Sequence, residues 1–326
     1  MNRAADWQRD AVDRYRAQIE SELAKTRKAE TREEGEDSET QATVSQASLD
    51  EQLARPQFRN LENLTAYADY ANPFIDHLRG VFYLALADDP GDLESARFAF
   101  RQTVAMEPEC RTMVDPDLAT IDAASSGRPT PTTWIYFMTG LGPRLEQFRV
   151  DVPIPVGDVN YVSAAFPALR FDNDFEKALA VEAAGVDPIN AVPLADMDRI
   201  VAAEFRARLP LIITQEIASA AVKATATYGL QAGLGSYGQI AGIIYQAAST
   251  AADLRLWRSV PKRILVGRVS TPADGRLVLS ASRPLGEVKV QPGVSNIVLV
   301  ALPASRTPVP SVLAIPLDRS MQAAAF

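Results

Sequence analysis

Five short apolar segments, separated by turn residues, fill the C-terminal part of the chain and constrain its fold more than any other feature. The connections between them are rich in Gly, Pro, Asp and Ser, the residues that form tight turns. Short strands at this spacing are typical of an antiparallel β-sandwich. We therefore expect an antiparallel β-sandwich-like C-terminal part built from residues 262–269, 275–282, 286–291, 296–302 and 311–316.

Three segments upstream also have the composition of strands. Residues 132–138 are aromatic and β-branched. Residues 145–154 alternate apolar positions with polar or proline positions, which is the period of a half-buried strand. A third strand is expected at 161–166. We expect all three to join the same sheet as the C-terminal strands.

Residues 195–256 have a helical pattern and are predicted to form a helical insertion in the β-rich part, with Asp196 or Asp198 as the N-cap. Much of this insertion is uncharged and rich in glycine and alanine. Glutamine, serine and threonine residues interrupt it, so it lacks the run of about 20 apolar residues that spans a membrane. A helical hairpin buried against the sheet is favoured, and an oligomer contact or a membrane-associated hairpin are the alternatives. Glycines at four-residue steps let helices pack closely, so the oligomer contacts would be Gly229, Gly233, Gly238 and Gly242.

The segment at 57–127 is predicted to be helical, with Pro73 in the first turn of a helix, where its missing N–H is tolerated. Small, aromatic and proline residues are spaced much as in a tetratricopeptide repeat, although the turn between the helices is longer and only one such unit is present. A generic helical hairpin therefore stays open as the alternative. The residues at the repeat positions are Gly80, Tyr83, Ala96, Phe100 and Pro108.

Two N-terminal segments precede this helical part. Residues 1–28 place an apolar residue at every fourth position among charges of both signs, which predicts an amphipathic helix. Residues 29–56 are acidic and poor in large apolar side chains, and are predicted to be a flexible linker. The chain is thus predicted to be an α+β protein with a tetratricopeptide-like helical domain at 57–127 and a β-rich domain at 128–326.

Charge and composition limit the classes of partner. The formal net charge is -8 and the basic residues do not cluster, so we expect no nucleic-acid partner. A single cysteine, Cys110, allows neither an intrachain disulfide nor a cysteine-based zinc site. The N-terminal residues lack the apolar segment of a secretory signal. If Met1 is the native start we expect a cytoplasmic protein, and if a leader has been removed, a periplasmic or outer-membrane-associated one.

Candidate catalytic and ligand-binding motifs each have a simpler structural interpretation. The glycines of "GLGSYG" (233–238) follow a helical pattern, whereas a dinucleotide-binding loop follows a buried strand. Asp172, Asp174 and Glu176 supply oxygens but lack the remainder of a calcium loop, so we expect capping and turn roles. His77 and Cys110 have no visible partner for acid–base or nucleophilic chemistry. We therefore expect no catalytic, metal or cofactor-binding residues.

Asp253, Arg255 and Trp257 alternate just before the strand at 262–269. An arginine between an acid and an indole can form a charge-assisted pair with the acid and stack on the ring. No second acid, histidine or thiol lies nearby in the sequence to share a proton transfer. We interpret the triplet as a structural pin at a corner between helix and strand.

Three stretches of the sequence resemble a family of uncharacterised bacterial proteins, many of them envelope lipoproteins, that have a tetratricopeptide-like front half. The stretches are "YANPFIDHLRGVFYLA", "TWIYFMTGLGPRLEQFRVDVPI" and "AADLRLWRSVPKRILVGRV", and the similarity covers roughly residues 60 to 270. The resemblance implies export and attachment in the periplasm or at the outer membrane, and no assigned enzymatic activity. Membrane attachment is expected only if a lipidated leader has been removed.

The first functional hypothesis is a non-enzymatic interaction or assembly protein of the bacterial cell envelope. It would bind a protein partner through the first helical hairpin, with Asn72, Phe74, His77 and Tyr83 as contacts. The alternative is a subunit of a homo-oligomeric ring or filament that uses the glycine-rich hairpin. A second alternative, a carboxylate-dependent hydrolase of envelope polymers, depends on Asp172 and Asp174.

Overall fold

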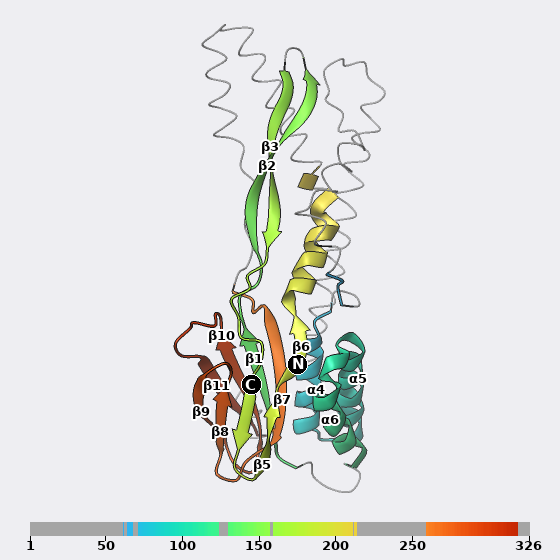
Figure 1. The fold of residues 1–326 in the computed structure, drawn as a ribbon. Coiled ribbons are helices and arrows are strands. Elements are labelled where there is room, and N and C mark those ends of the chain that lie inside the picture. The colour runs from blue at the N-terminus through green and yellow to red at the C-terminus, as the bar shows by residue number, and fades with distance from the viewer. Residues whose placement is uncertain are drawn as a thin grey trace.

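The computed structural model describes residues 61, 64–67, 71–123, 130–156, 159–210, 212–213 and 259–318. Within these, a layer of helices covers one face of a five-stranded sheet, and a four-stranded sheet covers its other face (Figure 1). The expected α+β class is confirmed, with helices in the N-terminal half and strands in the C-terminal half. The predicted segments 1–28 and 29–56 lie outside the described residues.

The helical layer consists of two long helices, a short 3-10 turn and a third helix. Asn72 caps the first helix by accepting a hydrogen bond from the Phe74 N–H at 3.1 Å, and Pro73 occupies its first turn as predicted. Asp89 caps the second helix in the same way, through the N–H of Asp92 at 3.0 Å. The elements are α4 (Pro73–Ala85), α5 (Pro90–Met106), η3 (Pro108–Cys110) and α6 (Arg111–Ala123).

Helices α4 and α5 approach closely at Gly80, one of the small residues that the sequence places between two helices. A Cβ atom at Gly80 would lie 2.7 Å from Cε1 of Phe100, which is fully buried. We therefore expect Gly80→Ala to lower the free energy of unfolding by about 1–3 kcal/mol through overpacking. Chemical denaturation measures this loss. Adding Phe100→Leu to Gly80→Ala should recover part of it, and purely additive losses would contradict this packing.

The five-stranded sheet lies in the middle of the structure and has the strand order β11-β10-β1-β7-β6. Three of its four strand pairs are antiparallel, but β1 and β10 run parallel. This differs from the purely antiparallel sheet that we expected. Parallel neighbours need a long connection, and β1 and β10 are separated by most of the β-rich part. The strands are β1 (Thr132–Thr139), β6 (Val192–Asp196), β7 (Arg263–Ser270), β10 (Ser295–Leu302) and β11 (Ser311–Leu317).

The four-stranded antiparallel sheet packs on the central sheet and completes a sandwich. Strand β1 shows why the central sheet is buried on both faces. Ile135 and Phe137 point into the core between the two sheets, whereas Trp134 and Tyr136 point into the core beneath the helices. The strands of the second sheet, in spatial order, are β5 (Val186–Asn190), β4 (Ala180–Ala183), β8 (Arg276–Ser280) and β9 (Pro284–Lys289).

The helices and the central sheet share one apolar core, in which Phe100 and Val114 of the helices lie with Trp134 and Val266 of the strands. The boundary at residue 127 between a helical and a β-rich domain remains a prediction. The described residues on the two sides of this boundary pack together in one core. Of the predicted insertion at 195–256, the structure describes a helix over 197–210 and residues 212–213.

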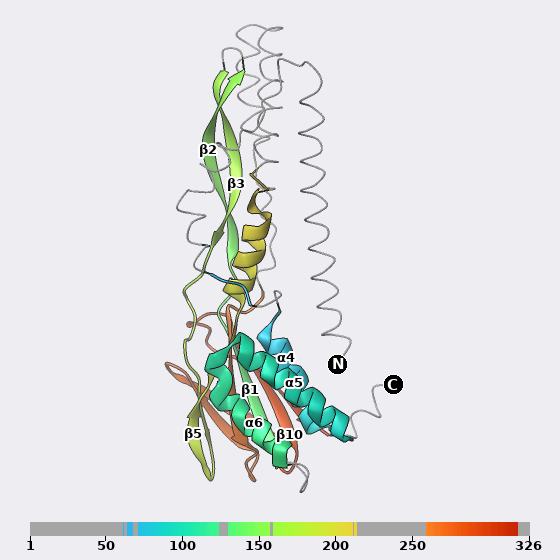
Figure 2. The same cartoon turned by 90° about the vertical axis from the view of Figure 1, so that its right-hand side faces the viewer.

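A long β-hairpin projects from one end of the sandwich (Figures 1 and 2). It consists of β2 (Arg144–Val156) and β3 (Val159–Arg170), which pair antiparallel from Arg144↔Arg170 to Val156↔Val159. Thirteen residues in β2 correspond to a length of about 40 Å. We call this hairpin the arm. The expectation that both strands join the sandwich is wrong, because they form a two-stranded sheet of their own.

The helix at 197–210 continues from β6 and runs beside the lower half of the arm in both views. Three residues of β3 in this lower half, Ala165, Phe166 and Leu169, are buried, as are Ala202 and Phe205 of the helix. A lone hairpin is marginally stable in water, so its base needs such cover. The arm therefore starts from a packed base and extends away from the body of the protein.

Candidate functional site

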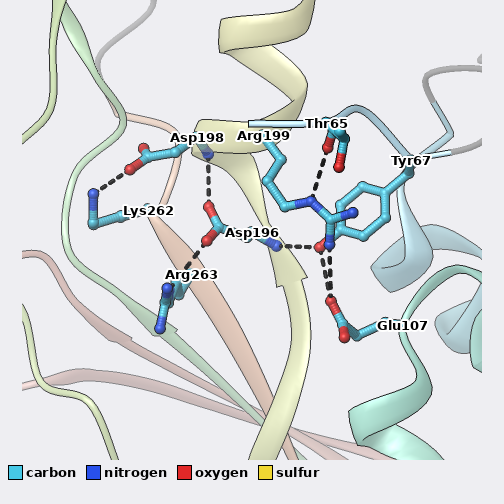
Figure 3. Close-up of polar contacts among 8 residues, drawn as sticks. All are labelled: Thr65, Tyr67, Glu107, Asp196, Asp198, Arg199, Lys262 and Arg263. Atoms are coloured by element: carbon cyan, nitrogen blue, oxygen red, sulfur yellow. Dashed lines mark hydrogen bonds and ion pairs between the residues drawn. The ribbon is translucent and has the colours of Figure 1, made fainter. Parts of the chain in front are cut away.

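A cluster of charged and aromatic side chains lies at the base of the arm, where β6 leads into the helix at 197–210 and β7 begins (Figure 3). Its most buried ion pair joins Asp198 and Lys262, whose side chains are 8% and 7% exposed. The Lys262 ammonium also lies 5.3 Å from the ring centroid of Phe175. Burial raises the pKa of Asp198 to about 6, and Lys262 opposes this shift.

Asp196 joins this ion pair to the start of the helix. Its side chain accepts a hydrogen bond from the Asp198 N–H at 3.0 Å, as an N-cap does, which confirms one of the two predicted caps. The same carboxylate pairs with Nε of Arg263 at 3.2 Å. One aspartate thus fixes both the first turn of the helix and the neighbouring strand β7 (Figure 3).

Tyr67 connects this cluster to the helical layer. Its hydroxyl accepts from the Asp196 N–H at 2.9 Å and donates to Oε2 of Glu107 at 3.1 Å. The Arg199 guanidinium lies 4.0 Å from the Tyr67 ring centroid, contacts Glu107 at 3.4 Å and donates to the Thr65 carbonyl at 2.9 Å. Burial raises the pKa of both Tyr67 and Glu107. Four separate parts of the chain are fastened together here.

The contacts of this cluster have a structural role, because they join separate parts of the chain. Three carboxylates, Glu107, Asp196 and Asp198, are each paired with a cation. Within the residues that the structure describes, no three His, Cys, Asp or Glu side chains are placed to hold a metal ion. Paired and buried charges fix geometry, because moving either partner alone leaves the other uncompensated. The cluster therefore fixes the start of the helix at 197–210, which runs beside the arm.

A second buried cluster lies under the helices. Asp117 of α6 is fully buried, accepts a hydrogen bond from the Trp134 indole at 2.8 Å and pairs with Nε of Arg268 at 2.6 Å. Burial raises the pKa of Asp117, and Arg268 and Trp134 oppose the rise. This cluster ties α6 to β1 and β7. It has the same composition, Asp, Arg and Trp, as the pin predicted from Asp253, Arg255 and Trp257, which lies outside the described residues.

Three of the four predicted partner-binding residues are engaged inside the protein. The side chain of Asn72 caps α4, and its amide lies 3.5 Å from the sulfur of Met197. Phe74 packs edge-on against Tyr136 with ring centroids 5.2 Å apart. His77 is fully buried and its Nδ1 is hydrogen-bonded to the Tyr136 hydroxyl at 2.8 Å. Tyr83 is partly buried beside the same core.

The carboxylates of "FDNDFE" each have a different hydrogen-bond partner. Asp172 accepts from the Asp174 N–H at 3.0 Å, Asp174 is hydrogen-bonded to Ser305, and Glu176 accepts from the Ser282 hydroxyl at 2.6 Å. Each therefore fixes a different loop, in agreement with the capping and turn roles expected.

Of the remaining sequence candidates, the structure describes Cys110 but not the four glycines. Cys110 is buried, and burial raises its pKa to about 12, so the thiol stays protonated and unreactive at neutral pH. Gly229, Gly233, Gly238 and Gly242, the glycines predicted as oligomer contacts, lie outside the described residues.

Among the described residues, no helix is long and apolar enough to cross a membrane. Fold and site geometry can also be compared with those of known proteins. No protein-family model, no curated protein and no solved structure matches this chain.

Proposed function

We propose that this chain is a non-enzymatic interaction and assembly protein of the bacterial cell envelope, and that the arm is the element that contacts its protein partner. The envelope location is supported by the sequence resemblance alone. The role of the arm is supported by one observation: a hairpin about 40 Å long extends from the body, beside a helix whose start is joined to β7 by a buried ion pair.

The pairing of the arm favours a surface that a partner covers. Val150 pairs with Ala164 and Val152 with Val162, so the register sets apolar residues opposite apolar residues. A two-stranded ribbon is marginally stable in water by itself, so another surface that covers it stabilises it. The partner would add this cover beyond the part of the arm that lies beside the helix at 197–210.

The fixed base explains how such an arm could bind selectively. Holding a binding element in one direction before contact lowers the entropy lost on association. Asp198 and Lys262 are buried and bridge the helix at 197–210 to the start of β7, so they fix the helix that runs beside the arm. The first helical hairpin, which we expected to bind the partner, instead directs Phe74 and His77 into the core.

Shortening the arm tests this proposal. Residues 151–163 would be replaced by Asn-Gly, a two-residue hairpin turn that joins Val150 to its partner Ala164 in register. We expect the body to unfold at an unchanged temperature, and the yield of partner captured from envelope extract to fall about tenfold or more, which corresponds to at least 1.4 kcal/mol. A full-length Lys289→Glu variant, changed at an exposed residue of β9, is the control. Equal capture by the shortened and control proteins would overturn the proposal.

A further inference from the structure

Strand β11 is an open edge of the central sheet. It pairs on one side with β10, from Ser311↔Ala301 to Ser295↔Leu317, and no other strand of the described residues pairs with its other side. Open edges present unpaired N–H and C=O groups, and soluble proteins protect them with charged residues or proline. The segment from 307 to 317 contains no charged residue, and the proline within β11 is Pro316, near the end of the strand. The part of the edge from Ser311 to Ile315 therefore has neither a charge nor a proline to prevent strand pairing.

Exposed apolar side chains gather at the same edge. Within the described residues the large hydrophobic side chains with high exposure are Phe98, Val278, Val309, Val312 and Leu313. Three of these belong to β11 or the turn before it, with Val309 73%, Leu313 55% and Val312 42% exposed. Val312 and Leu313 are successive residues of a strand, so they lie on opposite faces of the sheet and flank the edge on both sides.

Pro316 shows which backbone groups of β11 point to the open side of the strand. Pro316 lies within β11 opposite Asn296, and a proline inside a sheet occupies a position whose N side faces away from the ladder. Alternate residues of a strand direct their N–H and C=O groups the same way. Val312 and Ala314 therefore present N–H and C=O groups to the open side. Two antiparallel strands that meet here can form about four main-chain hydrogen bonds.

The turn before β11 is held in place by other loops, so the edge is formed before any contact. Arg283 donates to the carbonyls of Thr307 and Pro308, the latter at 3.2 Å. Asp174 accepts from the Ser305 N–H at 3.2 Å. A surface that is already ordered loses little entropy when it binds.

We infer that two copies of this chain associate through β11, pairing edge to edge in antiparallel register around a two-fold axis near Val312–Ala314. The uncharged segment places no like charges opposite each other. The antiparallel arrangement also brings the end that carries Arg306 toward the partner's end that carries Asp318, whereas a parallel one would place like charges together. The central sheet then continues across both copies. This inference does not depend on the arm as a partner-binding element.

The test is the mass of the full-length protein in solution, measured by sedimentation and light scattering over a wide range of concentration. We expect a dimer of the 35.4 kDa chain, and we expect Leu313→Lys to raise its dissociation constant about tenfold or more. Val278→Lys is the matched control, because Val278 is 47% exposed on a strand of the other sheet and should leave the dimer unchanged.

Two further measurements make the result specific. Hydrogen exchange at the amides of Val312 and Ala314 should slow as the dimer forms, and the arm-shortened protein should dimerise like the full-length chain. A monomer at every concentration would overturn the inference, as would a dimer that Leu313→Lys leaves intact. Loss of the dimer on shortening the arm would place the contact in the arm and would also overturn it.

Discussion

Replacing Arg268 with leucine is expected to lower the free energy of unfolding by about 3–5 kcal/mol. Arg268 is the cation that pairs with Asp117, whose side chain is 0% exposed. Without it, a buried carboxylate keeps only the hydrogen bond from the Trp134 indole. A buried charge left without its partner is among the most destabilising changes in a folded protein. Urea denaturation at neutral pH measures the loss.

Two comparisons show whether burial is the cause. Arg276→Leu removes an arginine whose side chain is 61% exposed and pairs with Glu287 at 3.6 Å, so it should cost no more than about 1 kcal/mol. Adding Asp117→Asn to Arg268→Leu should restore part of the stability, because a neutral amide oxygen can still accept from Trp134. Equal losses for Arg268→Leu and Arg276→Leu would contradict the role assigned to the buried cluster.

The second large effect is a loss of stability in acid through His77. Burial lowers the pKa of His77 from 6.5 to about 3. Between these values the unfolded chain binds a proton that the folded protein does not bind, so protonation stabilises the unfolded state. The contribution of His77 is complete above pH 6.5 and is lost at about 1.4 kcal/mol per pH unit below it, which is about 2 kcal/mol at pH 5.

A comparison with His77→Gln isolates this contribution. Asp198 acts in the opposite direction, because its pKa is raised from 3.8 to about 6 and the folded state takes up its proton first as the pH falls. This contribution is common to both proteins and cancels in the difference. We expect the stability advantage of the wild type over His77→Gln to shrink by about 2 kcal/mol between pH 7 and pH 5. A difference that stays constant with pH would show that His77 is accessible or already charged.

Elements with strong local signals could be predicted from the sequence. The Asn72–Pro73 pair marks the start of α4 because it combines a cap with a first-turn proline. The segments of β7, β8, β10 and β11 were recognisable as short apolar strands. We expected His77 to contact a partner, although it lies in the apolar stripe of α4 with Val81 and Leu84. That stripe favours a buried histidine over a partner contact.

Other elements were missed because proline hides them. Strands β5 and β6 contain Pro188 and Pro193, which argue against a strand unless the strand lies at an edge. Both are edge strands of their sheets. Helix α6 lies within the segment predicted to be helical, but Pro116 in its interior hides its bounds. Edge position is a property of the assembled sheet, so no local pattern could reveal it.

The cluster of charged residues at the base of the arm could not be predicted from the sequence, because its partners come together only in the assembled fold. Asp198 and Lys262 are 64 residues apart, and Glu107 and Arg199 are 92 apart. The sequence around each of these residues does not predict which residue it pairs with. The alternation of Phe148, Val150 and Val152 likewise predicts a strand but not the sheet that it joins. Only the assembled fold shows that this strand leaves the sandwich.

The measurement that tests the central claim most directly is photo-crosslinking from the arm in intact cells. A photoreactive residue would replace Asp151, which pairs with Ser163 in the part of the arm that the shortened protein lacks, and in a second protein it would replace Lys289, which is exposed on β9 of the sandwich. The proposed function predicts a discrete crosslink to an envelope protein from position 151 and none to that protein from position 289. A crosslink from position 289 alone, or none from position 151, would contradict the proposal that the arm binds the partner.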